Sequence, residues 1–209
     1  KSFIAYNSGV NRLHVWDGST VRRVGMGTAA ASSTANVGGG DTFLARDYKV
    51  RYVEKSGSTY LRIGELGAIE SVGQQVTTAS LTVTKPAAIS EGETHWELYG
   101  KASAGTTYKL VASTLVATTT YSDSTVDPST YSGAAAPTVG TYTNWTAMRY
   151  LSTDGNRLLG AGSFATAAGT KYSRVFFSPI LGTGIGDLER VPDTTDQKNW
   201  IDCDENSGG

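Results

Sequence analysis

Apolar and polar residues alternate in several short stretches of this chain. In one of them, Tyr48, Val50 and Tyr52 take every second position and would share one face of a strand. Lys49 and Arg51 lie between them and would face the other way. No stretch repeats apolar residues at helical spacing over three turns, so the pattern predicts an all-β protein. Further strands are expected at residues 80–84, 95–99, 108–111 and 173–178.

The density of the expected strands divides the chain into three zones. Residues 1–40 combine two or three short strands with a stretch of small residues, 28–40, that is typical of a linker. Residues 41–127 hold the densest strand pattern, and residues 128–209 begin with a second loose stretch before further short strands. We therefore expect a separate domain between two outer zones.

The last zone has the size and strand content of one β-propeller blade. Its strands are expected at residues 145–150, 157–160, 174–178 and 200–202, and four strands in about 60 residues are typical of such a blade. The tripeptide Asn-Arg-Leu at 11–13 recurs at 156–158, each time before an apolar strand. The outer zones are therefore interpreted as propeller-type blade segments that flank an inserted domain.

Short motifs of the outer zones resemble the blade pattern of tailed-bacteriophage tail-hub and tail-nozzle proteins. They are 156–162 (NRLLGAG), 173–178 (SRVFFS), 199–202 (NWID), the glycine pair 208–209 and, at the other end, 13–18 (LHVWDG). The resemblance implies a structural protein of a phage virion: a tail hub, nozzle or neck subunit that acts through assembly contacts rather than catalysis. It also implies location in the phage tail or neck, a homo-oligomeric ring, contacts with other virion proteins, and DNA only as passing cargo.

A closed propeller takes at least four blades, and the outer zones hold fewer than two. The chain would then be a piece of a longer protein, or strands of partner molecules would complete the propeller. The sequence does not distinguish between these two possibilities.

The middle zone resembles a fibronectin type III or immunoglobulin-like β-sandwich. Residues 94–99, 108–112 and 119–123 are similar to its strands C, C′ and E. Residues 48–53 and 64–66 are similar to strand F and to the segment after it, which normally come last. This order implies a circularly permuted sandwich, or the tail of one sandwich before another. The single cysteine excludes the immunoglobulin disulfide and favours the fibronectin-like form.

Composition removes several classes of protein. Hydrophobic residues make up 39% of the 209 residues and aromatic residues 10%, which excludes a disordered chain. Thr, Ser, Ala and Gly form almost half of the chain, as suits strands and turns. No apolar run is long enough for a transmembrane helix, and no signal peptide is visible. The net charge of -1 argues against a dedicated nucleic-acid binder.

The charge is unevenly distributed along the chain. Residues 1–62 carry nine Lys+Arg and four Asp+Glu, whereas the remaining residues carry nine and fifteen. The net charges of +5 and -6 would suit head-to-tail contacts between identical subunits. Scatter over solvated strand faces would produce the same imbalance.

Motifs for cofactor or metal chemistry are weak. Residues 25–30 (GMGTAA) fit G-x-G-x-x-A, but small residues and a glycine triplet follow instead of a helix. The glycine-rich stretch 182–187 lacks the Lys-Ser/Thr of a P-loop. His14 and His95 fall in expected strands and no G-x-S-x-G elbow is present. With Cys203 as the only cysteine, a structural zinc site within the chain is not expected.

Acidic residues near the end of the chain leave a cation site open. Their spacing does not match a twelve-residue calcium loop, so a solvated loop is expected, with an opportunistic Ca²⁺ site as the alternative. A glycosidase pair would need two carboxylates facing each other across a cleft. The residues concerned are Asp193, Asp196, Asp202, Asp204 and Glu205.

Taken together, the sequence predicts no catalytic, cofactor-binding or metal-binding residue and no enzyme. The alternative is a surface adhesin or carbohydrate-binding β module, with exposed aromatic side chains from Tyr121, Tyr131 and Tyr142. A glycoside hydrolase fragment is a third possibility. The tryptophans also fall in expected strands, and three of the four are expected in cores: Trp16, Trp96, Trp145 and Trp200.

Overall fold

A computed structural model describes residues 4–6, 14–16, 19, 21–23, 26–137, 150–153, 158–161, 164–166, 169–171, 174–177 and 200–202. The chain divides into two compact units, and each is described here by itself. One unit, called the 27–139 unit, is a continuous segment. The other, called the two-segment unit, consists of Lys1–Met26 and Gly140–Gly209.

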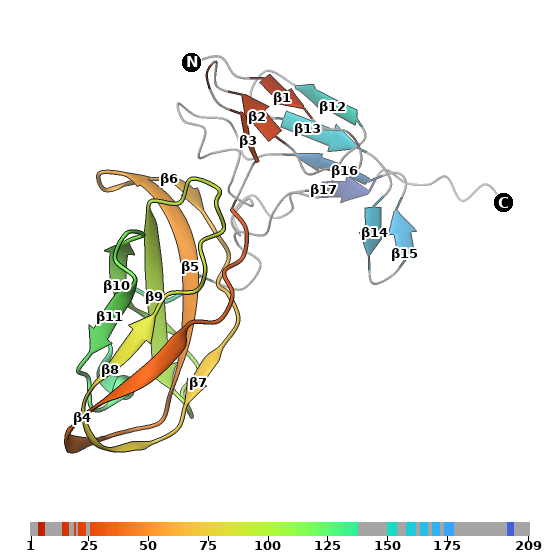
Figure 1. Ribbon diagram of the computed structural model, residues 1–209. Helices are drawn as coiled ribbons and strands as arrows, with labels where there is room; N and C mark the ends of the chain where they lie inside the picture. The colour runs from red at the N-terminus through yellow and green to blue at the C-terminus, as the bar shows by residue number, and fades with distance from the viewer. Residues whose placement is uncertain are drawn as a thin grey trace. The chain divides into compact units, whose positions relative to one another are not determined.

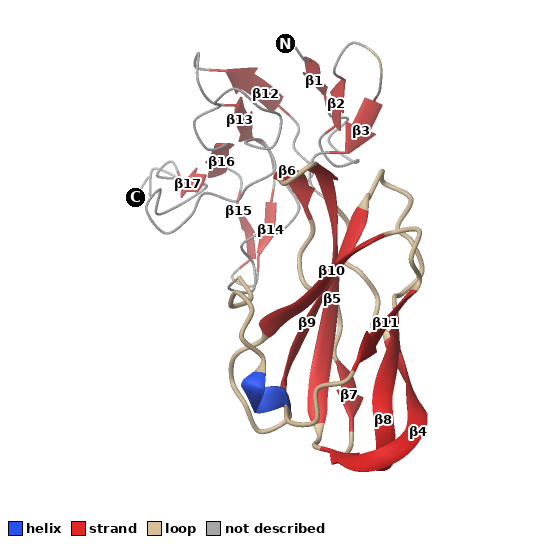
Figure 2. Ribbon diagram, turned by 90° about the vertical axis from the view of Figure 1, so that its left-hand side faces the viewer, coloured by secondary structure: helices blue, strands red, loops and turns tan. Residues whose placement is uncertain are grey.

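The expected all-β class is confirmed. The described strands pair antiparallel, and a 3-10 turn, η1 (Pro128–Thr130), is the sole helical element of the described residues. Figures 1 and 2 show the strands of the 27–139 unit in two layers. They are β4 (Ser33–Phe43), β5 (Arg46–Ser56), β6 (Thr59–Ile63), β7 (Glu70–Val72), β8 (Gln75–Thr84), β9 (His95–Ala102), β10 (Lys109–Leu115) and β11 (Thr120–Asp123).

One sheet of the 27–139 unit has the order β10-β9-β5-β6, with β7 also paired to β5, and the other has the order β11-β8-β4. The predicted alternation in β5 is confirmed: Tyr48, Val50 and Tyr52 share one face of the strand and are fully buried. In β9, Leu98 pairs with Val50 and Trp96 pairs with Tyr52, so these side chains point to the same buried face of the sheet. The indole nitrogen of Trp96 donates to Thr118 O at 2.8 Å, just before β11, and so connects the two sheets.

The expected linker at 28–40 is wrong for most of its length. Ser33–Phe43 form β4, which pairs with β8 from Ser33–Thr84 to Phe43–Gln75. One of its glycines, Gly39, serves close approach between the strands. A Cβ on Gly39 would lie 2.3 Å from the backbone nitrogen of Ala79, so only glycine lets the two strands come together there.

The described strands of the two-segment unit pair antiparallel in chain order, except that a separate hairpin comes between two of them. The first segment contains β1 (Ile4–Tyr6), β2 (His14–Trp16) and β3 (Val21–Arg23) in a sheet of that order. In the second, a four-stranded sheet has the order β12-β13-β16-β17, and β14 and β15 pair separately as a hairpin. Among the described strands, neither of these two sheets closes on itself. The bounds are β12 (Tyr150–Thr153), β13 (Leu158–Ala161), β14 (Phe164–Thr166), β15 (Gly169–Lys171), β16 (Arg174–Phe177) and β17 (Trp200–Asp202).

Candidate functional site

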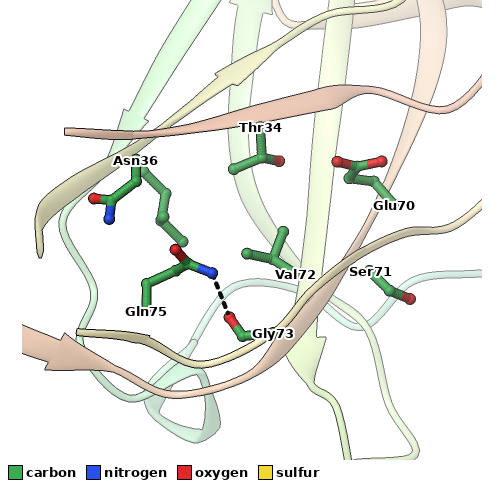
Figure 3. Close-up of a pocket in the computed structure, with 8 residues that line it drawn as sticks. Thr34, Asn36, Glu70, Ser71, Val72, Gly73 and Gln75 are labelled. Atoms are coloured by element: carbon green, nitrogen blue, oxygen red, sulfur yellow. Dashed lines mark hydrogen bonds between the residues drawn. The ribbon is translucent and has the colours of Figure 1, made fainter.

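A polar cleft of about 200 Å³ opens between the two sheets of the 27–139 unit, where the edge strand β4 faces β7. We call it the β4–β7 cleft. Figure 3 shows side chains of both strands arranged around it. Its lining consists of Thr34, Asn36, Glu70, Ser71, Val72, Gly73, Gln75 and Leu81.

The pairing of β4 with β8 explains why polar side chains line the cleft. Thr34 pairs with Val83 and Asn36 with Leu81, and paired residues project to the same side of a sheet. Leu81 and Val83 belong to the core, so Thr34 and Asn36 project to the inner side of the sheet as well. Thr34 is half-buried there and Asn36 is exposed. The Thr34 hydroxyl oxygen is buried and has no hydrogen-bond partner among the described residues. One hydroxyl of the lining is therefore left unsatisfied within the described part of the chain.

The opposite wall of the cleft supplies a negative charge. The side chain of Glu70 is half-buried, and its carboxylate makes no hydrogen bond or ion pair within the described part of the chain. The side-chain amide of Gln75 donates through Nε2 to Gly73 O at 3.2 Å. The Oε1 atom of Gln75 remains available as an acceptor. No residue of the lining is cationic. The arrangement suits a ligand that brings hydrogen-bond donors and a positive charge.

The backbone edge beside the cleft is open. β4 pairs with β8 alone, and no backbone hydrogen bond of the described residues reaches the other edge of Ser33–Gly40. The edge of β10 is different, because Leu110 N donates to Ala134 O and Ala136 N donates to Tyr108 O, each at 2.9 Å. The following chain thus covers the start of β10 but leaves β4 uncovered.

A second carboxylate, Glu97, lies on the outer face of the five-stranded sheet and is fully buried. Arg51 Nη2 and Lys55 Nζ each approach it at 2.8 Å, and the hydroxyls of Tyr60 and Tyr99 donate to it. Burial by itself raises the pKa of Glu97, but the charge of Arg51 and the hydrogen bonds from Lys55, Tyr60 and Arg51 outweigh it and lower that pKa. Every oxygen is occupied, so the cluster stabilises the sheet.

A third carboxylate, Asp123, joins the two sheets from β11. It accepts hydrogen bonds from Arg46 Nη1 at 2.9 Å and from the hydroxyls of Tyr48 and Tyr131. Burial first, and then the nearby Tyr131 and Asp123, raise the pKa of Tyr48. Burial also raises the pKa of Asp123, but the hydrogen bonds from the two tyrosines and from Thr125 reverse the shift and lower it. This cluster, too, is satisfied internally and serves the fold.

The aromatic surface expected from Tyr121 and Tyr131 is wrong. Tyr131 turns its hydroxyl toward Asp123, and Tyr121 is half-buried, so the two do not form an exposed platform. Aromatic rings lie instead on the outer face of the five-stranded sheet, where Lys55 Nζ is 4.3 Å from the centre of the Tyr60 ring. Tyr142 lies outside the described residues.

Other candidates from the sequence do not come together. His95 lies in β9 with Nδ1 2.9 Å from Thr94 Oγ1, and His14 lies in β2. Within the described part of the chain, no group of three or more His, Cys, Asp or Glu could hold a metal ion. No helix follows the glycines at 25–27, because the next element is β4. The acidic residues Asp193, Asp196, Asp204 and Glu205, together with Cys203 and the stretch 182–187, lie outside the described residues.

The tryptophans are described in part. Trp96 is fully buried between the sheets, and Trp16 is 40% exposed. Trp200 and Asp202 lie in β17, and Trp145 is outside the described residues. One core tryptophan and one exposed tryptophan are therefore established.

Comparison of the chain with protein-family models, curated proteins and solved structures found no match. Among the described residues, no helix has the length and apolar character needed to cross a membrane.

Proposed function

We propose that the protein is a structural component of a phage virion, a tail hub, nozzle or neck subunit, and that it works through assembly contacts rather than catalysis. The observation that carries the proposal is the sheet β12-β13-β16-β17, in which strands pair antiparallel in chain order. Four antiparallel strands in such a meander are the unit from which propeller blades are built. Three of the motifs that resemble phage blade strands, 156–162, 173–178 and 199–202, include the strands β13, β16 and β17 of this sheet, whereas the motif at 13–18 includes β2 of the other sheet.

The division of the chain is consistent with an inserted domain. The two-segment unit is interrupted by the 27–139 unit, whose two antiparallel sheets would form the fibronectin-like sandwich. Residues 48–53, similar to strand F, lie in β5, and residues 64–66, similar to the segment after it, follow β6. Both precede β9, β10 and β11, which include most of the residues similar to strands C, C′ and E. A circularly permuted sandwich would have this order.

Open sheets at both ends of the chain support assembly as the activity. Among the described strands, the sheet of β1, β2 and β3 and the sheet of β12, β13, β16 and β17 are both unclosed, and each leaves edge strands. Unpaired edges recruit further strands or need cover. Copies of the chain in a ring, or adjoining virion proteins, would supply that cover.

The test is made on phage particles from the source culture. Mass spectrometry of purified particles should find peptides of this chain at a fixed copy number, and labelled antibodies should mark the tail or neck in electron micrographs. Native mass spectrometry of the purified chain should then show a discrete oligomer. Particles that lack the chain would contradict the proposal.

A carbohydrate-binding module is the second candidate, and the β4–β7 cleft is the observation that favours it. Hydroxyl, amide and carboxylate groups line the cleft, as a polyhydroxylated ligand would require. A hydrolase is less well supported, since the lining includes a single carboxylate, Glu70, whereas glycoside hydrolysis commonly uses two. Binding to immobilised glycans that an Asn36→Ala change abolishes would favour this candidate over the virion role.

A further inference from the structure

We propose that β4 binds an extended strand of a partner polypeptide, and that a lysine or arginine of this strand enters the β4–β7 cleft and pairs with Glu70. The inference rests on the proposed assembly function and specifies one of its contacts. In this mode the partner's backbone continues the sheet β11-β8-β4.

The backbone of β4 is suited to accept a strand. Residues 33–37 pair with β8 in unbroken register, and the irregularities begin only after Val37. Natural edge strands are commonly protected by charges, proline or bulges. The sequence from 24 to 40 contains neither a charged residue nor a proline, so the regular part of β4 has no such protection.

Side-chain direction connects this edge to the cleft. An added strand would place every second side chain on the side of Thr34 and Asn36, toward β7. There it would meet the unpaired carboxylate of Glu70 and the unpartnered hydroxyl of Thr34. Thr34 is unsatisfied in the described structure, and an incoming donor would remove that deficit.

Charge and shape define the incoming side chain. Because the lining holds one carboxylate and no cation, a basic group is favoured and an acidic one is repelled. Val72 and Leu81 provide apolar contact for the methylene stem of a lysine or arginine. A volume of about 200 Å³ is suited to a single long side chain. The partner segment is therefore extended, with one basic residue between uncharged neighbours.

The experiment uses the full chain and a set of synthetic peptides. The first is Ac-Thr-Thr-Val-Lys-Val-Thr-Thr-NH₂, and the second carries Glu in place of Lys. Two more keep the Lys but carry N-methyl groups on alternate residues, one set on odd and one on even positions. Binding is followed by amide chemical shifts and by slowed hydrogen exchange in residues 33–37.

We expect the Lys peptide to bind and to protect amides of β4, and the Glu peptide to bind at least tenfold more weakly. One of the two N-methylated peptides should lose binding and the other keep it, because only alternate N–H groups of an added strand face β4. Glu70→Gln should weaken the Lys peptide about tenfold, whereas Asp41→Asn, which changes an exposed carboxylate of β4 outside the cleft, should leave its affinity unchanged.

Absence of binding by the Lys peptide, equal behaviour of the two N-methylated peptides, or equal effects of the two variants would each overturn the inference. Glycans that shift Thr34 and Asn36 when the peptides do not would overturn it in favour of a sugar site. These outcomes are separate from the virion test. A chain that is present in phage particles but does not bind the Lys peptide keeps its proposed function and loses this contact.

Discussion

Glu97 and Glu70 belong to the same five-stranded sheet of the 27–139 unit, yet their surroundings are opposite. Glu97 is fully buried and receives two cations and two tyrosine hydroxyls. Glu70 is half-buried and has no partner within the described part of the chain. Burial of a charge is tolerated only where partners compensate its lost hydration. The first carboxylate is thus a component of the fold, and the second is available to another molecule.

The largest expected effect comes from removing the satisfied carboxylate. Glu97→Ala leaves Arg51 and Lys55 without their main partner in a buried position, and should lower the free energy of unfolding by about 3–5 kcal/mol. Hydrogen exchange of β9 amides in increasing urea measures this change for the 27–139 unit. Glu70→Gln is the matched control and should change it by less than about 0.5 kcal/mol. Comparable losses in the two variants would remove the distinction between the sites.

A substitution of Asp123 tests whether a buried, paired carboxylate also stabilises the fold where the two sheets meet. Asp123→Asn keeps the shape of the side chain but deprives the buried Arg46 of its counter-charge. We expect a loss of about 2–4 kcal/mol in the free energy of unfolding, since one charge of a buried pair remains uncompensated. The same exchange measurement applies, now read at β8 and β11. A neutral effect would mean that the hydroxyls of Tyr48 and Tyr131 suffice without the charge.

Gly39→Ala tests how closely β4 approaches β8 beside the open edge. The added Cβ would lie 2.3 Å from Ala79 N, so one strand must shift, and we expect a loss of about 1–3 kcal/mol. Gly38→Ala is the control, because nothing lies within 4 Å of a Cβ at that position. Thermal unfolding of the two variants compares them directly. If Gly38→Ala destabilises as much, the cost comes from the strand backbone and not from contact with Ala79.

The smallest expected effect is the dependence on pH. The pKa values of Glu97 and Asp123 are lowered in the folded state despite their burial, because cations and hydrogen bonds favour the charged forms. Their stabilisation is therefore complete above the unfolded pKa values near 4, and is lost as the pH falls through the lower folded values.

The free energy of unfolding should decrease by about 1 kcal/mol or more as the pH is lowered from 5 to 3. The decrease should be shallower in Glu97→Gln and unchanged in slope in Glu70→Gln. Urea midpoints measured across this pH range give the slopes. A wild-type slope retained in Glu97→Gln would assign the acid sensitivity to other carboxylates.

The sequence predicts the strands with a clear apolar face and misses the one without it. β5 and β9 were recognisable because Tyr48, Val50, Trp96 and Leu98 alternate with polar residues. β4 resembled a linker because small residues fill it, and its strand character depends on pairing with β8, about 40 residues later. The β-branched residues Thr34 and Val37 were the one available signal.

The candidate site could not be predicted, since its walls come from β4 and β7 in different sheets. The charge clusters were hidden for the same reason. Arg51 and Glu97 are 46 positions apart, and Tyr48 and Asp123 are 75 apart, so only the folded chain brings them together.

The segment that covers β10 limits how copies of the 27–139 unit can polymerise. Gly133 fits so closely over this strand that a Cβ there would lie 1.9 Å from Leu110 O. If both β4 and β10 were open, each copy could add to the next without closure, as in a fibre. With the start of β10 covered by its own chain, that part of the strand is closed to addition. Cutting the unit before residue 133 would remove the cap and expose the start of β10 as a further edge to which a strand can add.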